Sequence, residues 1–279
     1  MKPLKQPLPP NRTLQQVWNH YQTEAALAQR LKSADRAGRQ RILATMYDEL
    51  FSAVPDHPRL TRRTDSADTA RANASKRAVL RRWLRRDAVV LEFAPGDGEF
   101  AASIAPAVRK VIGVDISDQR APGRSWPDNF ELVLYDGFSL PQLEPGSVDV
   151  IFSDQLLEHL HPEDTAGHLQ LCCGLLKPGG SYVIRTPHPV SGPWDVSRYF
   201  CDDPEGFHLK EWTYHELREA LVRAGFQRFG AAWNARLTSV PLPYGYFVAV
   251  ESLFAKLPRR LAQRSVRPFV PTVLCIATK

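Results

Sequence analysis

The run Val89-Val-Leu-Glu-Phe-Ala-Pro-Gly-Asp-Gly98 decides the fold. Its first five residues are mostly apolar and predict a buried strand, while the small residues after them predict a tight turn before a helix. Small residues let the backbone approach a ligand closely, and the first turn of a helix offers unpaired N–H groups beside it. We therefore expect a nucleotide-like molecule to bind on this turn.

Short apolar segments alternate with helical patterns after residue 88, which is typical of a parallel sheet covered on both faces. Strands are expected at 88–93, 110–115, 130–134, 148–153, 181–186, 226–233 and 271–278. Helices are expected near 97–107, 117–123, 163–176 and 214–224. The sequence thus predicts a three-layer α/β fold, with a seven-stranded, mostly parallel sheet and an antiparallel last strand.

The chain before this region has helical patterns and no convincing strand. Thr13 and Gln16 resemble a capping box, Asp35 can cap a second helix, and a third helix is expected at 69–86 after a loop at 53–68. We expect an N-terminal helical cap over residues 1–87 and a second domain over 88–279. The second domain would carry a helical insertion at 244–267.

Composition favours an ordinary globular protein, since 43% of the residues are hydrophobic and 24% are charged. No apolar run reaches 18 residues and the first residues lack a secretory pattern, so a cytoplasmic location is expected. The four cysteines form no C-x-x-C pair and are read as reduced core thiols. They predict neither a zinc site nor a disulfide framework, and no metal is expected.

Charge is distributed unevenly along the chain. Residues 1–88 carry a net charge of +10 (18 basic, 8 acidic), residues 89–250 carry −9 (12 and 21), and residues 251–279 carry +5 (6 and 1). A nucleic-acid module concentrates positive charge on its recognition domain, so no nucleic-acid partner is expected. Two interpretations of the basic flanks stay open, namely solvated helix faces or peripheral contact with an anionic substrate or membrane surface.

The turn alone does not identify its ligand. Gly96, Gly98 and Ala101 also satisfy the G-x-G-x-x-A form of a dinucleotide fingerprint. Asp115, 19 residues after Gly96, is placed to accept hydrogen bonds from ribose hydroxyls, which both nicotinamide cofactors and S-adenosylmethionine possess. No Tyr-x-x-x-Lys pair of the short-chain dehydrogenase type occurs, which counts against hydride transfer.

Several motifs together resemble the class I, Rossmann-like S-adenosylmethionine-dependent methyltransferases, over about residues 86–230. The first-strand motif E/D-x-G-x-G-x-G matches from Glu92 to Gly98, with Ala94 in place of the first glycine. The other matching segments are Val114-Asp-Ile116, Tyr135-Asp-Gly137, Phe152-Ser-Asp-Gln-Leu-Leu-Glu-His159 and Leu176-Lys-Pro-Gly-Gly180. The resemblance implies S-adenosylmethionine as the cofactor and methyl transfer as the activity.

The resemblance also implies roles for single residues. The methionine part of the cofactor would be held by Glu92, Ala94, Gly96 and Gly98. The ribose and adenine would be contacted by Asp115, Ile116, Asp136 and Gly137. The rim near the sulfonium would be formed by Asp154 and Gln155. For Asp115 and Asp136, a turn-forming role after a strand is the simpler alternative.

Two histidines are candidates for removing a proton from an acceptor. His159 follows the fourth strand, beside the expected sulfonium, and its alternative role is to brace the loop through a hydrogen bond. His188 stands where related proteins with Thr-Pro-Asn have asparagine. His161 precedes Pro162 at a helix start and is expected to be a cap or surface residue.

Residues 188–212 form a long segment after the fifth strand, rich in aromatic residues and histidine. We interpret it as an acceptor-binding lid, against the alternative of a structural cover. Its substrate-binding candidates are Arg198, Tyr199, His208 and Trp212. The predicted function is methyl transfer to a hydroxyl of a small molecule, sugar or lipid; a nicotinamide-dependent oxidoreductase and a non-catalytic cofactor-binding subunit remain alternatives.

Overall fold

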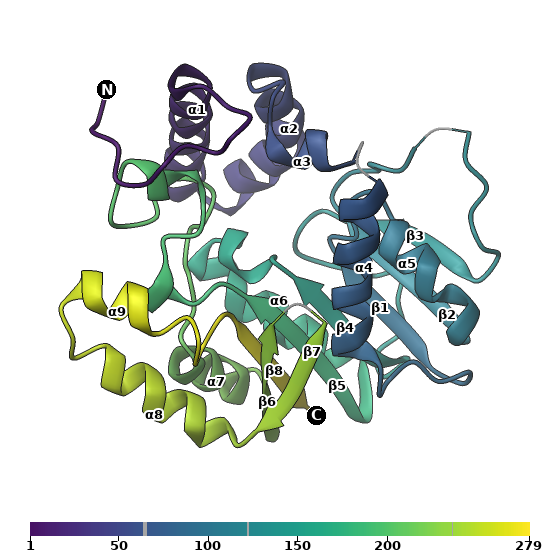
Figure 1. The fold of residues 1–279 in the computed structure, drawn as a ribbon. Coiled ribbons are helices and arrows are strands. Elements are labelled where there is room, and N and C mark those ends of the chain that lie inside the picture. The colour runs from purple at the N-terminus through teal and green to yellow at the C-terminus, as the bar shows by residue number, and fades with distance from the viewer. Residues whose placement is uncertain (64–65, 122, 236) are drawn as a thin grey trace.

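The computed structural model describes residues 1–63, 66–121, 123–235 and 237–279, and within these residues eight strands form one sheet (Figure 1). The strand order is β3-β2-β1-β4-β5-β8-β6-β7. The first five strands in chain order pair in parallel: β1 (Val89–Phe93), β2 (Lys110–Asp115), β3 (Phe130–Leu134), β4 (Val148–Asp154) and β5 (Leu176–Thr186). Three strands complete the sheet: β6 (Arg228–Ala235), β7 (Thr238–Leu242) and β8 (Val273–Thr278).

The expected Rossmann-like architecture and the antiparallel last strand are confirmed, but the expected number of strands was too low. β8 inserts antiparallel between β5 and β6, and the additional strand β7 pairs antiparallel with β6. The sequence pattern did not indicate β7, because it is a largely exposed edge strand that contains Pro241. Proline lacks the N–H of a central strand and is tolerated at an edge.

Helices cover both faces of the sheet. On one face, α4 (Ser66–Leu80) and α5 (Glu99–Ile104) pack against alternate strand residues such as Val90 and Phe152. On the other face, α6 (Pro162–Leu175), α7 (Tyr214–Arg223) and α8 (Tyr244–Phe254) pack against residues such as Leu91 and Ile151. Since successive side chains of a strand point to opposite faces, the apolar strands fill both cores.

The N-terminal helices lie over the carboxyl ends of the parallel strands, at the top of Figure 1. They comprise α1 (Leu14–Ser33), α2 (Arg36–Ala53) and the short α3 (Pro58–Arg63), which falls where only a loop was expected. The Thr13–Gln16 capping box and the Asp35 cap are both present. The third expected helix corresponds to α4, which ends at Leu80 instead of residue 86.

One other expectation was wrong. The expected helix at 117–123 is absent from its described residues, 117–121 and 123. The insertion at 244–267 contains two helices, α8 and α9 (Arg259–Ser265), because Pro258 begins a new helix after the turn that follows α8. No helix among the described residues combines the length and apolar character needed to cross a bilayer.

Candidate functional site

The turn after β1 has the backbone conformation that its small residues allow. Ala94, Gly96 and Gly98 have φ angles of 54°, 61° and 74°, in the left-handed region. Gly98 caps α5, and a Cβ added to it would lie 3.2 Å from the Trp126 ring. Glycine is therefore required at position 98 for two reasons, its φ angle and the closeness of Trp126.

Asp115 ends the neighbouring strand β2 and faces this turn. Its side chain is buried, and it accepts hydrogen bonds from the backbone N–H groups of Gly96 (3.2 Å) and Ile116 (2.8 Å). Burial raises the pKa of the Asp115 carboxyl, and the backbone donors oppose that shift. A carboxylate held in this way has lone pairs left for the hydroxyl groups of a ligand.

A cavity of about 820 Å³ opens between these strand ends and the helical cap. Of the ten expected cofactor residues, seven line it: Ala94, Gly96, Asp115, Ile116, Gly137, Asp154 and Gln155. Its volume lies in the range of cofactor sites. It lies beside β1 and β4, where the strand order of the parallel sheet reverses, which is where open α/β sheets bind ligands. The residues present therefore fit S-adenosylmethionine.

Three expected cofactor residues lie outside the cavity lining. Glu92 is 1% exposed beneath the turn. Gly98 packs against Trp126. Asp136 is exposed and accepts hydrogen bonds from the N–H groups of Phe138 and Ser139, both 2.8 Å long. The turn-forming alternative for Asp136 agrees with this geometry.

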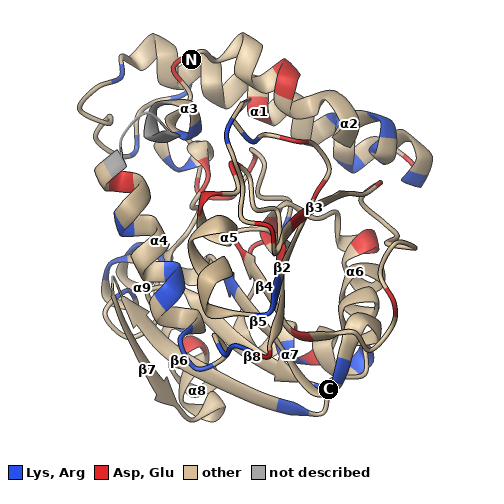
Figure 2. Ribbon diagram, turned by 90° about the vertical axis from the view of Figure 1, so that its right-hand side faces the viewer, with Lys and Arg blue, Asp and Glu red and all other residues tan. Residues whose placement is uncertain are grey.

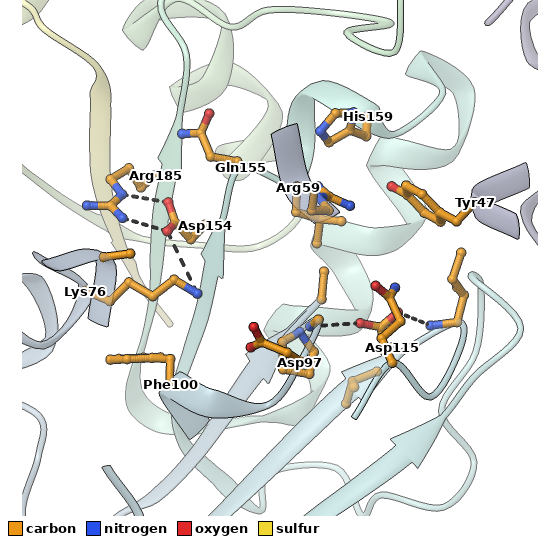
Figure 3. A pocket seen from close by; sticks show the side chains of 18 of the residues that line it. Tyr47, Arg59, Lys76, Asp97, Phe100, Asp115, Asp154, Gln155, His159 and Arg185 are labelled. Carbon is orange, nitrogen blue, oxygen red and sulfur yellow. Dashed lines mark hydrogen bonds and ion pairs between the residues drawn. The ribbon is translucent and has the colours of Figure 1, made fainter. Parts of the chain in front are cut away.

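A buried network of charges forms one wall of the cavity, and Lys76 of α4 joins its parts. Lys76 Nζ lies 2.9 Å from Glu92 Oε1 and 4.0 Å from Asp154 Oδ2. Arg185 of β5 binds Asp154 through two hydrogen bonds of 2.6 Å. Figure 3 shows Lys76, Asp154 and Arg185 together on one side, with Asp115 on the other. The second oxygen of Glu92, Oε2, is buried without a hydrogen-bond partner among the described residues.

The sequence analysis missed several cavity residues. The charged ones are Lys76, Arg59, Asp97 and Arg185, and the cap adds Leu43, Met46, Tyr47 and His57. Nothing in the Ala- and Arg-rich pattern of α4 separates Lys76 from its exposed neighbours. The N-terminal helices therefore form part of the cavity lining. Figure 2 shows acidic residues gathered between the cap and the sheet, in agreement with the charge of the central region.

His159 lines the cavity, and His188 does not. The Nδ1–H of His159 donates to the carbonyl oxygen of Phe207 at 3.0 Å, since that oxygen can only accept. Burial lowers the pKa of His159 to about 3, so the imidazole is neutral near pH 7. His188 is fully buried, and its Nε2–H donates to Glu251 of α8 at 3.0 Å. This geometry agrees with a structural role for His188 rather than with proton transfer in the cavity.

Most of the segment 188–212 packs between the helical cap and the sheet. Tyr199 packs in a cluster with Val17 and Tyr21 of α1, and Arg198 donates to the Tyr199 hydroxyl. Trp212 is buried in the sheet core, and His208 binds Glu211. None of these four candidates lines the cavity. From this segment the cavity lining includes Trp194, and Pro187, which precedes the segment, also lines the cavity.

Comparison with known proteins identifies the family. Residues 66–228 match the methyltransferase domain family, which is more than half of the chain. The chain is 34% identical over 139 residues to a probable S-adenosylmethionine-dependent methyltransferase of Mycolicibacterium smegmatis, and this match covers 50% of the chain and about half (51%) of that relative's length. The chain belongs to the methyltransferase domain family, and this resolves the choice between the two cofactor interpretations.

Solved structures show the same fold. A Burkholderia thailandensis 1,6-didemethyltoxoflavin-N1-methyltransferase, with 1,6-didemethyltoxoflavin and S-adenosylhomocysteine bound, superposes with a TM-score of 0.54 at 18% identity, covering 88% of this chain and 91% of its own. A structure of the Haloferax volcanii Trm112 methyltransferase activator in complex with the putative methyltransferase superposes with a TM-score of 0.53 at 19% identity. The match covers 76% of this chain and 91% of the matched one. An Archaeoglobus fulgidus S-adenosylmethionine-dependent methyltransferase superposes with a TM-score of 0.50 at 21% identity, and the match covers 75% of this chain and 94% of its own.

Proposed function

We propose that this protein transfers the methyl group of S-adenosylmethionine to a hydroxyl oxygen of a small-molecule acceptor by in-line displacement. The observation that carries the proposal is the shape of the cavity, which continues from the turn after β1 to the inner side of the helical cap. The cofactor supplies a methyl group on a positively charged sulfur. The protein has to align the acceptor with it and exclude water.

The acceptor would lie between the cap and the carboxyl ends of β4 and β5. Leu43, Met46 and Tyr47 of α2 supply apolar surface there, and Trp194 supplies an aromatic face. Arg59 also lines this part, with its guanidinium 5.4 Å from the centre of the Tyr47 ring. In this proposal Arg59, and not the candidate Arg198, contacts a phosphate or carboxylate of the acceptor.

His159 is proposed to contact the acceptor oxygen. It lies near Gln155 at the same end of the cavity in Figure 3. Its Nδ1–H is held by Phe207, so in the neutral ring the other nitrogen, Nε2, carries a lone pair that can accept the hydroxyl proton. The low pKa of the imidazole makes it a weak base. Its proposed contribution is therefore mainly to orient the hydroxyl.

A sugar or lipid acceptor is the proposed class, and the outer surface of α8 and α9 supports a lipid source. Leu253, Leu257, Leu261 and Phe269 are exposed there. Residues 252–279 contain six basic residues and no acidic one. Exposed apolar side chains among arginines are typical of a surface that rests on an anionic bilayer, which we propose as its partner.

The test combines cofactor titration with a methyl-transfer screen. Calorimetry should detect binding of S-adenosylmethionine and no binding of NADH. Labelled S-adenosylmethionine, incubated with polar and lipid extracts, should then label one acceptor, whose methylated atom is identified by NMR. His159→Ala should keep its cofactor affinity and lose turnover, whereas Arg59→Ala should raise the KM of an anionic acceptor. Methyl transfer to nitrogen or carbon, or to a protein, would refute the proposed acceptor class.

A further inference from the structure

Glu158, His159 and His208 meet behind the cavity wall that His159 forms. Each side chain offers one possible ligand atom, and these three atoms all lie within 4.8 Å of one another. Glu158 is fully buried, His208 is 7% exposed, and the two imidazole rings have centroids 5.2 Å apart. Two imidazole nitrogens and one carboxylate oxygen are a ligand set found in catalytic zinc sites and in non-haem iron sites.

Hydrogen bonds fix all three side chains. The Nδ1–H of His159 donates to the Phe207 carbonyl (3.0 Å), and the Nδ1–H of His208 donates to Glu211 Oε1 (2.8 Å). In each neutral ring the opposite nitrogen, Nε2, then carries a lone pair. An imidazole held by a carboxylate or a carbonyl through its other nitrogen is the usual arrangement of a metal-binding histidine.

Glu158 has an unused oxygen. Its Oε2 accepts a hydrogen bond from the Thr186 hydroxyl at 2.8 Å, whereas Oε1 is buried with no hydrogen-bond partner among the described residues. Buried oxygens of this kind are rare, because an unmade hydrogen bond costs free energy. A bound cation would give this oxygen the partner that it lacks.

The surrounding charges favour a cation. Besides Glu158, the carboxylates of Glu211 and Asp195 lie close enough to act on His208, and that of Glu24 acts on His159. The positive charge of Arg59 also acts on His159. Among the described residues, carboxylates therefore outnumber guanidinium groups around this cluster.

A second cluster in the same protein has the same residue types, but its hydrogen bonds leave no imidazole lone pair of His20 for a metal ion. His20, Glu24 and His57 also lie within 4.8 Å of one another. There, Arg12 donates to His20 Nδ1 at 2.9 Å, so His20 donates to Glu24 through Nε2 at 2.8 Å and keeps no lone pair for a metal. The other oxygen of Glu24 accepts from the Phe207 N–H. This cluster is a closed hydrogen-bond network.

We propose that Glu158, His159 and His208 bind one divalent first-row transition metal ion, with zinc as the simplest candidate. The ion would lie at the cavity wall, since His159 lines the cavity, and would keep a coordination position for an oxygen ligand. Cysteine spacing gave no sign of this site, because its ligands are two imidazoles and a carboxylate from two separate segments. The binding itself does not rest on the proposed function. A bound ion would use the Nε2 lone pair of His159, so the acceptor oxygen would then contact the ion in place of the imidazole, and this use in methyl transfer does rest on the proposed function.

Cobalt substitution tests the site without an acceptor. The full-length protein is stripped with a chelator and titrated with Co²⁺ while its visible d–d absorption is recorded, and zinc affinity is measured by competition. We expect one equivalent of cobalt, with no thiolate-to-cobalt charge-transfer band because no cysteine is a ligand. Glu158→Gln and His208→Asn should abolish this spectrum, and Glu211→Gln should weaken zinc binding about 10- to 100-fold.

The controls keep the result decisive. His161→Asn changes a nearby histidine that caps α6, and asparagine caps helices equally well, so its spectrum should equal that of the original protein. Absence of cobalt and zinc binding in the original protein would overturn the proposal, whatever the variants do. Binding that survives in folded Glu158→Gln and His208→Asn, as judged by circular dichroism, would place the ion elsewhere and would also overturn it. Loss of methyl transfer with intact metal binding would instead count against the proposed function alone.

Discussion

Replacement of Lys76 by methionine should destabilise the protein far more than loss of an ordinary surface lysine. At 2.9 Å and an effective dielectric constant of about 20, the attraction between Lys76 and Glu92 amounts to about 6 kcal/mol before desolvation is counted. Methionine fills most of the lysine volume but leaves Glu92 buried without a cation. Asp154 keeps Arg185, so Glu92 is the group that loses its partner.

In the Lys76→Met variant, Glu92 can take up a proton, which limits the loss of unfolding free energy. Protonating a carboxyl whose unfolded pKa is about 4.3 costs about 4 kcal/mol at pH 7 and about 1 kcal/mol at pH 5, at about 1.4 kcal/mol per pH unit. Breaking a buried ion pair from one side typically costs about 3 to 5 kcal/mol. We therefore expect Lys76→Met to lower the free energy of unfolding by about 3 to 4 kcal/mol at pH 7. The deficit should shrink as the pH falls to 5, because a raised folded-state pKa costs stability only above the unfolded pKa.

Urea unfolding followed by tryptophan fluorescence at both pH values measures this effect. Lys110→Met is the matched control, since Lys110 and Glu131 form a pair with side chains about half exposed, and such pairs contribute less than about 1 kcal/mol. Combining Lys76→Met with Glu92→Gln should cost less than the sum of the two single changes. A loss at pH 7 no larger than that of the Lys110 control, or additive single changes, would refute the reasoning.

Three further predictions concern the cofactor, the cover segment and the outer surface. Asp115→Ala should weaken S-adenosylmethionine binding by about 1 to 3 kcal/mol, because ribose hydroxyls lose a charged acceptor; an unchanged dissociation constant in calorimetry contradicts the assignment. His188→Asn should lower the free energy of unfolding by about 2 kcal/mol through the lost bond to Glu251. Cofactor affinity should not change, and a selective loss of turnover would show that the structural role is incomplete. Leu261→Glu should reduce sedimentation with anionic vesicles severalfold and leave methyl transfer to a soluble acceptor intact, whereas equal sedimentation would exclude this surface.

The sequence predicted best what depends on local pattern. The apolar strand with its small-residue turn, and the next strand with its acidic end at Asp115, are each recognised from a few consecutive residues, and all lie where expected. β7 was missed because an exposed edge strand with Pro241 has neither the apolar run nor the clean alternation of a core strand.

The part of the site that could not be predicted depends on long-range partners. Lys76 has the sequence surroundings of a solvated helix, and only the packing of α4 on the sheet brings it to Glu92 and Asp154. The segment 188–212 has the composition of a binding loop, but composition does not determine which side chains face inward. His188 is bonded to a glutamate 63 residues away, so its role depended on a helix whose position the sequence did not reveal.

The backbone N–H and C=O groups of Phe207 connect the helical cap to His159 in the cavity wall. Its N–H donates to Glu24 of α1, and its carbonyl oxygen accepts from His159. A swing of α1 that carries this residue outward would deprive His159 of the bond that fixes its ring. Ligand exchange through an opened cap would then coincide with a misaligned imidazole, and the aligned state would exist only when the cavity is shut. Water could then enter the cavity only in the open state, in which His159 is not aligned for methyl transfer. In the closed state His159 is aligned and water is excluded, so the methyl donor would be protected from water whenever transfer can occur.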